Sequence, residues 1–140
     1  MTADELIAAL DLAPHPEGGH YRQTWVGPLR DGRPSGTAIL FLLRSDERSH
    51  WHRVDADEVW LFHAGAPLTL SISSNGRHAR QHALGTDIRA GQSPQVVVPA
   101  DAWQSARTEG EWTLVSCTVS PGFTFDGFEL APPDFDIPPG

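Results

Sequence analysis

Lysine is absent from this chain, and all 10 basic residues among its 140 are arginine. The absence excludes Schiff-base lysine chemistry and a lysine-dependent phosphate loop. With a formal net charge of -8, the protein is also not expected to bind nucleic acid or anionic membranes. The single cysteine, Cys117, excludes an internal disulfide and a zinc site built from several cysteines.

Long apolar runs and a signal-peptide pattern are missing as well. We therefore expect a cytoplasmic protein without membrane-spanning segments. The length of 140 residues predicts one domain, over residues 1–130, because a chain of this size buries about two-thirds of its unfolded surface. Residues 131–140 are rich in proline and aspartate, which predicts a surface or disordered tail.

One helix followed by many short strands is the predicted element order. Thr2 and Glu5 form a capping-box pattern, which predicts a helix over about residues 3–11. Apolar stretches separated by Gly, Pro, Asn and Asp then recur at short intervals, and Asn75-Gly76 is a strong hairpin signal. This spacing predicts an antiparallel all-β sandwich or barrel, with strands over 21–26, 37–43, 67–73, 77–84, 95–98, 102–108 and 112–119.

The most informative motif is His50-Trp51-His52 with Glu58 downstream. In a regular strand the two histidines point to one face, about 6.6 Å apart along the axis. If residues 53–57 form a turn, the flanking strands pair and all three polar side chains converge. Two imidazoles and a carboxylate suit Zn, Fe, Ni or Mn. The alternative is a half-exposed polar hairpin, but the apolar surroundings favour an enclosed pocket, since burying such groups without partners is costly.

Strand alternation extends this predicted pocket. Trp60 and Phe62 share a strand face with Glu58 and would form a wall for a small ligand. Of two neighbouring residues, Tyr21 and Arg22, only one can face inward, and we favour Tyr21. The stretches 37–43 and 59–61 are apolar on both faces, so one face needs a cover, and a homodimer is the simplest one.

These patterns resemble the cupins, which are double-stranded β-helix (jelly-roll) barrels of the RmlC-like kind. His50-x-His52, Glu58 and Gly65 match the first cupin signature, and 99–104 stands where the second is expected. More narrowly, the chain resembles the cupin 5 subfamily, a domain of unknown function. That resemblance rests on five blocks, at residues 15–22, 49–53, 57–68, 98–104 and 115–123.

The departures from the signatures bear on metal binding. Five residues separate His52 from Glu58, more than the general signature has, and Asp101 and Gln104 replace a glycine and a histidine. The resemblance implies a divalent metal held by His50, His52, Glu58 and Gln104. An amide oxygen is a poorer ligand than an imidazole, and Gln104 could instead hydrogen-bond a bound molecule.

Two functional classes follow from the resemblance. In the first, the protein is an enzyme for a small polar molecule, with oxygenase, isomerase or lyase chemistry on Fe, Ni, Mn or Zn and with Glu58 or a histidine moving protons. A metal-free version would resemble sugar-nucleotide epimerases, with His50 or His52 as base and Tyr21 as acid. In the second, the protein binds a small molecule without turnover. Neither class requires a nucleotide cofactor.

Overall fold

The computed structural model describes residues 1–140, and its first element is the helix α1 (Ala3–Ala9). The capping box is present: Thr2 Oγ1 accepts from the Glu5 amide, and the Glu5 carboxylate accepts from the Thr2 amide. The helix ends two residues before the predicted limit, because Leu10 is its C-cap and Asp11 has a φ of 55°. A backbone with positive φ cannot continue an α-helix.

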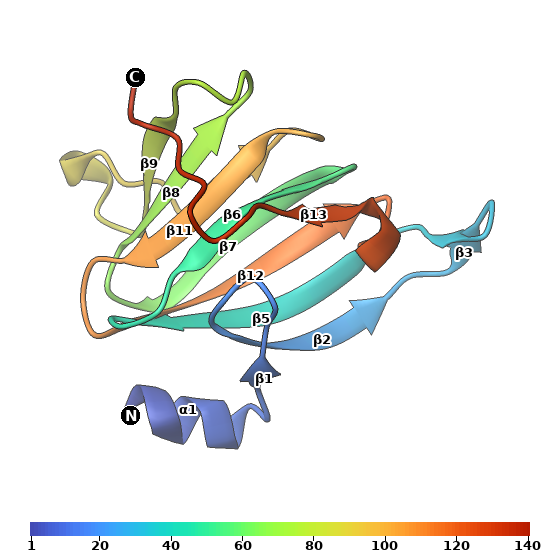
Figure 1. The fold of residues 1–140 in the computed structure, drawn as a ribbon. Coiled ribbons are helices and arrows are strands. Elements are labelled where there is room, and N and C mark those ends of the chain that lie inside the picture. The colour runs from blue at the N-terminus through green and yellow to red at the C-terminus, as the bar shows by residue number, and fades with distance from the viewer.

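Two antiparallel sheets face each other after the helix (Figure 1). The first has the order β1-β2-β5-β12-β7-β10 and contains Ala13–Pro14, His20–Val26, Thr37–Arg44, Trp112–Ser120, Asp57–Gly65 and Gln95–Val98. The second has the order β13-β6-β11-β8-β9 and contains Phe128–Leu130, Ser49–Val54, Trp103–Thr108, Leu68–Ser73 and Arg80–Leu84. This arrangement confirms the predicted jelly-roll barrel.

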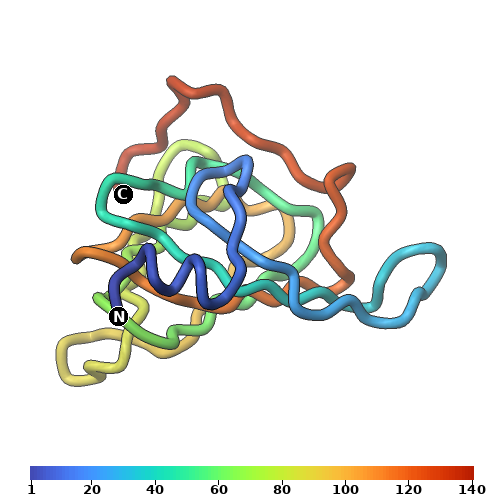
Figure 2. Tube along the Cα trace, turned by 90° about the horizontal axis from the view of Figure 1, so that it is seen from below, coloured from blue at the N-terminus to red at the C-terminus, as the bar shows by residue number.

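The remaining elements are short. Strands β3 (Leu29–Arg30) and β4 (Arg33–Pro34) form a separate hairpin, which projects from the body of the molecule (Figure 2). Two 3-10 turns, η1 (Ile88–Ala90) and η2 (Phe125–Gly127), lie in connections. No helix has the length and apolar character that crossing a membrane requires.

The predicted Asn75-Gly76 hairpin joins β8 to β9. The Asn75 side-chain oxygen accepts from the amides of Arg77 and His78, and Gly76 has a φ of 74°. Asparagine supports such turns by bonding to its own backbone, and glycine tolerates the positive φ. Pairing resumes only at Arg80, so the second strand begins three residues later than predicted.

Strands β6 and β7 do not pair with each other, contrary to the sequence-based expectation. Strand β6 belongs to the second sheet and β7 to the first. The chain changes sheet at Asp55 and Ala56, between the two strands. His52 and Glu58 therefore approach each other across the barrel interior rather than along a hairpin.

The barrel interior has an apolar half and a polar half. A buried cluster fills the apolar half, with Phe41, Leu43, Trp60 and Val115 from the first sheet packed against Leu68, Leu70, Ile72 and Ala106 from the second. Towards the other end of the same strands, Thr37, Ile39, Glu58 and Val119 line a pocket. The sheets are thus held together mainly by the apolar half.

The outer face of the first sheet is only partly covered. Leu42 is fully buried, whereas Leu40, Val59 and Leu61 on the same face are half-buried and Val97 is exposed. These apolar side chains lie where the sequence predicts a homodimer contact, and the homodimer stays a prediction.

Residues 131–140 cross the outer face of the second sheet. Ala131 and Ile137 are buried against Trp51 and Ala79. The Trp51 Nε1 donates to the Asp136 carboxylate at 2.8 Å, and Ala79 exchanges backbone hydrogen bonds with Pro138 and Gly140. The C-terminal segment is thus a packed layer over Trp51.

Candidate functional site

A single cavity of about 110 Å³ lies in the polar half of the barrel. Its walls come from both sheets, from the loop before β2 and from the segment before β13. The lining residues are His15, Glu17, Tyr21, Gln23, Thr37, Ile39, His52, Val54, Glu58, Cys117, Val119, Phe123 and Phe125.

The loop between β1 and β2 supplies two of the polar groups, His15 and Glu17. The His50 amide donates to the Glu17 carbonyl at 2.7 Å, and the Ser49 hydroxyl hydrogen-bonds the Glu17 carboxyl. Gly18 has a φ of 109°, and a Cβ there would collide with the Arg48 carbonyl oxygen. Only glycine permits both the conformation and the approach, so this residue lets the loop dock on β6 and hold Glu17 inside the barrel.

Burial dominates the electrostatics of Glu17. The carboxyl has lost its water, which raises its pKa from 4.5 to about 8, although the Ser49 hydrogen bond lowers it in part. Desolvation disfavours the charged form of any acid. At neutral pH Glu17 is therefore mostly protonated and uncharged.

His15 is also uncharged at neutral pH, because desolvation is the main cause that lowers its pKa to about 4. Its Nδ1 lies 3.1 Å from the Glu17 amide and accepts that proton. The hydrogen of the neutral ring is therefore on Nε2, since one ring nitrogen accepts and the other donates. The ring packs edge-on against Tyr21 with centroids 4.4 Å apart, so its orientation is set on both sides.

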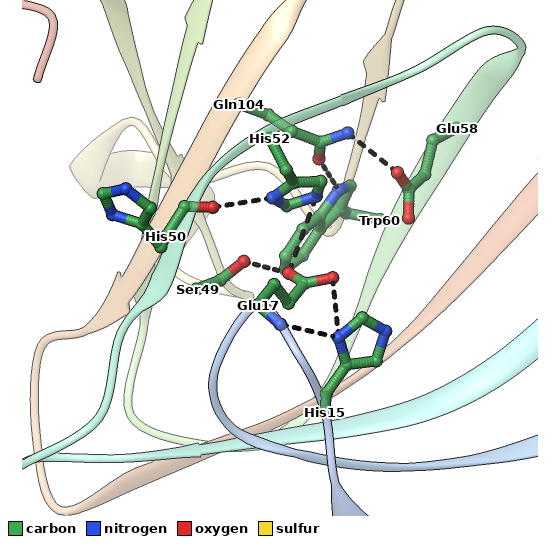
Figure 3. A network of polar contacts seen from close by, with 8 residues as sticks. All are labelled: His15, Glu17, Ser49, His50, His52, Glu58, Trp60 and Gln104. Atoms are coloured by element: carbon green, nitrogen blue, oxygen red, sulfur yellow. Dashed lines mark hydrogen bonds and ion pairs between the residues drawn. The ribbon is translucent and has the colours of Figure 1, made fainter. Parts of the chain in front are cut away.

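His52 presents a bare nitrogen to the same cluster (Figure 3). Its Nδ1 donates to the His50 carbonyl at 2.7 Å, which leaves the Nε2 lone pair free. Nε2 lies 3.5 Å from a Glu17 oxygen, which is longer than a hydrogen bond. Burial is the main cause that lowers the His52 pKa, and the nearby Glu58 opposes it. His52 and Glu17 are thus neighbouring neutral groups rather than an ion pair.

Glu58 is held by a buried chain of hydrogen bonds. Gln104 Nε2 donates to Glu58 Oε1 at 2.8 Å, and Trp60 Nε1 donates to Gln104 Oε1 at 2.9 Å. Burial raises the pKa of Glu58 to about 7, and the neighbouring His52 and the Gln104 hydrogen bond lower it in part. Near neutral pH, Glu58 is therefore divided between its acid and its carboxylate.

Cys117 also faces the cavity, next to Glu58. Burial, the largest cause, raises its pKa well above 9.0, and the two glutamates add to the effect. The thiolate is the nucleophilic form of cysteine. Cys117 is consequently a neutral wall of the pocket.

The prediction that His50 and His52 share a face is wrong. Gln104 pairs with His52 but Ala106 pairs with Ser49, so β6 carries one extra residue over this interval. Such a bulge breaks the alternation of side chains. Ser49 and His52 consequently both face inward, while His50 turns away and its Nε2 lies 2.8 Å from the Pro132 carbonyl (Figure 3).

Of the other residues predicted for the pocket, only Glu58 and Tyr21 line the cavity. Trp60 and Phe62 lie in or against the apolar cluster, and neither lines the cavity. Gln104 is 1% exposed and touches Glu58 rather than the open space. The prediction of Trp60 and Phe62 as pocket walls is therefore wrong, because the pocket ends at Glu58 and the core begins at Trp60.

The four predicted metal ligands do not fit a divalent ion. His50 points elsewhere, and the Gln104 oxygen already accepts from Trp60. Only His52 and Glu58 of this set line the cavity. The structure contains no group of three or more His, Cys, Asp or Glu side chains placed to hold a metal ion.

Sequence reasoning missed His15 and Glu17 as site residues. Both lie in the block 15–22, where Pro16 and two glycines, directly after Pro14, indicate a loop. A loop usually lies on the surface, so the sequence pattern alone gives no reason to place its side chains inside the barrel. The available signal was the pair of glycines after Glu17, which permits a close backbone approach.

Comparisons with known proteins agree with the fold. The model of the family Cupin_5, described as Cupin superfamily (DUF985), matches residues 4–131. A crystal structure of a Shewanella oneidensis protein is 42% identical, with a TM-score of 0.89, over 94% of this chain and 85% of that one. A hypothetical protein from Leishmania major is 32% identical, with a TM-score of 0.85, over 94% of this chain and 88% of that one.

More distant structures share the fold alone. A variant of Bacillus subtilis oxalate decarboxylase is 13% identical, with a TM-score of 0.66, over 87% of this chain and 31% of that one. Another structure of that enzyme, described by its Mn(II) centres, has a TM-score of 0.64 and the same identity, over 86% of this chain and 30% of that one. No curated protein matches the sequence.

Proposed function

Because the chain belongs to the Cupin_5 family of the cupin superfamily, we propose that its barrel pocket binds a small polar molecule and moves protons on it by acid–base chemistry without a metal. His52 is the base and Glu58 the acid. The observation that carries this proposal is the gathering of His15, Glu17, His52 and Glu58 around one cavity.

The protonation states support this assignment. His52 keeps a free Nε2 lone pair because its Nδ1–H is bonded to the His50 carbonyl. Glu58, with a pKa near 7, holds a proton in a large part of the molecules at neutral pH. Acids and bases that titrate near the working pH are the most effective general catalysts.

The proposed step balances within the site. His52 Nε2 takes a proton from a carbon next to a carbonyl group of the bound molecule. The C–H electron pair forms a C=C bond, and the carbonyl oxygen takes the Glu58 proton, which leaves an enol between an imidazolium and a carboxylate. Return of the proton to the same carbon from the other face, while Glu58 takes back the enol proton, gives an epimer. Where the reacting carbon carries a hydroxyl, delivery of the proton to the former carbonyl carbon, while Glu58 takes the proton of that hydroxyl, gives an isomer with the C=O moved by one carbon. No oxidant or reductant is needed.

Three residues are proposed to act on the two catalytic groups, His52 and Glu58, rather than on the substrate. Gln104 and Trp60 orient the Glu58 carboxyl. The neutral Glu17 stands beside His52 and stabilises the imidazolium less than a carboxylate would, which favours return of the proton. Tyr21 packs on His15, whereas the Glu58 carboxyl is held in place by Gln104 and has a pKa near 7, so we assign the acid role to Glu58 rather than Tyr21.

The test is exchange of carbon-bound protons for deuterium in D₂O, followed by proton NMR for dihydroxyacetone, glyceraldehyde, glycerate and pyruvate. We expect exchange with at least one compound, a loss of roughly 100-fold or more in His52→Asn and Glu58→Gln, and a falling rate above about pH 7. His50→Asn is the matched control, because His50 lies two residues from His52 but outside the pocket, and it should exchange like the parent.

Two results would contradict the proposal. Binding without exchange in any compound would assign the protein to the second functional class, a binding module without turnover. Stoichiometric Fe, Ni, Mn or Zn in untagged protein, lost in His52→Asn, would replace the metal-free mechanism by a metal-dependent one.

A further inference from the structure

The charge of the pocket lining restricts what it can bind. None of the 13 lining residues is an arginine, and the chain has no lysine. Near pH 7 burial keeps Glu17 and the two imidazoles largely neutral, and Glu58 is divided between its acid and its carboxylate, so no lining group carries a positive charge. A carboxylate or phosphate entering this space would meet no fixed positive charge, and an unpaired buried charge is costly.

The arginines near the pocket are engaged elsewhere. Arg33 forms two hydrogen bonds with the Asp55 carboxylate, at 2.7 and 3.1 Å, and a third to the Gly122 carbonyl. Arg53 donates two hydrogen bonds to Glu129. Neither arginine lines the cavity, so neither provides a bidentate clamp for an anion, which is how proteins usually bind carboxylates and phosphates.

Size gives a second restriction. The cavity of about 110 Å³ is smaller than the roughly 150 Å³ space that holds a benzene molecule in another protein. Since benzene has six non-hydrogen atoms, the same ratio gives about four or five non-hydrogen atoms for this cavity. A nucleotide-linked sugar is far larger than this space.

The lining also offers several neutral hydrogen-bonding groups. His15 Nε2–H, the Tyr21 hydroxyl, the Gln23 amide and the Thr37 hydroxyl can each bond a hydroxyl or carbonyl group. Ile39, Val54 and Val119 supply apolar walls between them. This mixture suits a short carbon chain that carries oxygen at several positions.

We propose that the pocket takes an uncharged hydroxycarbonyl compound of about three carbon atoms and discriminates against carboxylates and phosphates of similar size. The inference rests on the proposed function, because it names the substrate class of that same site. The two proposals can nevertheless fail separately, because an acid–base site of this kind could also act on an anion if a positive charge were present.

The test compares glyceraldehyde with glycerate, which differ only in an aldehyde hydrogen replaced by a carboxylate oxygen. Binding to the full-length protein is followed at pH 7 by saturation-transfer NMR and calorimetry, with His52→Asn as the variant that reports on the pocket. We expect glyceraldehyde to bind roughly tenfold or more tightly than glycerate, and dihydroxyacetone to behave like glyceraldehyde but its phosphate ester like glycerate.

The outcomes separate the two proposals. Tighter binding of glycerate or of the phosphate ester overturns the charge inference, while His52-dependent proton exchange in those anions would leave the proposed function standing. Binding of none of the four compounds overturns the charge inference as well. If no carbonyl compound exchanges protons either, the proposed function falls with it.

Ile39→Arg is a second variant, because it places a cation on a half-buried wall of the cavity. Provided that it folds, judged by circular dichroism, its preference should move towards glycerate. An unchanged preference would contradict the charge argument. Ile39→Met, which leaves the wall uncharged, is the matched control.

Discussion

Strand β5 passes through two different environments inside one barrel. Phe41 and Leu43 belong to the apolar half, whereas Thr37 and Ile39 line the pocket. Strand β12 divides in the same way, with Val115 in the core and Val119 at the cavity. The pleated backbone is alike in both halves, so the strands alone do not make the pocket.

The two halves of the barrel differ in the segments that face these strands. In the apolar half, Leu68, Leu70 and Leu84 pack against the first sheet and leave no space. In the polar half, the 15–19 loop brings in Glu17, and the bulge in β6 turns His52 inward. Stability and chemistry are thus separated along the same strands, and each half can be tested by itself.

The largest expected effect is in the apolar half. Leu70 is fully buried, so Leu70→Ala should lower the free energy of unfolding by about 3 kcal/mol, measured by urea denaturation. The folded fraction should still carry out proton exchange at the parental rate. His52→Asn should have the opposite effect: proton exchange is lost, and the free energy of unfolding changes by less than in Leu70→Ala. Loss of exchange in folded Leu70→Ala would show that the two halves are not independent.

The next effect concerns pH and Glu17. The folded pKa of Glu17 is about 8 against 4.5, so folding holds a proton that the unfolded chain releases, and stability falls as pH rises through this interval. Between pH 6.5 and 8 the parent should lose about 2 kcal/mol through Glu17. Glu17→Gln should lose correspondingly less over the same interval, in urea denaturation at each pH.

The histidines act in the opposite direction and in a lower range. The folded pKa of His15 is about 4 against 6.5, so its contribution to stability is present above pH 6.5 and is lost as pH falls towards 4. It therefore does not mask the Glu17 effect above pH 6.5. An equal decline in Glu17→Gln and the parent would contradict the neutral state assigned to Glu17.

A smaller effect is expected at the border between the halves. Gln104→Met removes the hydrogen bonds to Trp60 and Glu58 while keeping a similar volume, and should cost about 1–2 kcal/mol of stability. Because the Gln104 bond lowers the pKa of Glu58, its loss should raise that pKa. Carbon-13 NMR of the Glu58 carboxyl measures the shift. Gln81→Met, at an exposed position of strand β9, should change neither quantity.

The smallest effect on the barrel itself is expected from a substitution on the outer face of the first sheet, away from both halves of the interior. The homodimer predicted from the outer face would bury more than about 1,000 Å² in total. Leu61→Glu, on that face, should give a monomer in analytical ultracentrifugation, with unchanged exchange in the pocket. Leu29→Glu, on the projecting β3–β4 hairpin, should stay dimeric. A monomeric parent at micromolar concentration would refute the assembly.

Several local features could be predicted because they depend on neighbours in sequence. The Thr2–Glu5 capping box and the Asn75-Gly76 turn are stabilised by contacts within three residues. The inward position of Glu58 followed from alternation within β7, and its burial agrees with it. The barrel itself was indicated by the number and spacing of short strands and by the resemblance to cupins.

By itself, then, the sequence determined the helix start, the strand spacing, the barrel class and the lack of any lysine to bind anions. Only the tertiary structure decided which histidine enters the pocket, because the extra residue in β6 is defined by pairing with β11. It also decided that Glu17 is buried, since the hydrogen bonds that hold it come from Ser49 and His50, more than thirty residues away. Contacts between distant segments set the charges of the site, because burial rather than residue type determines which groups are neutral.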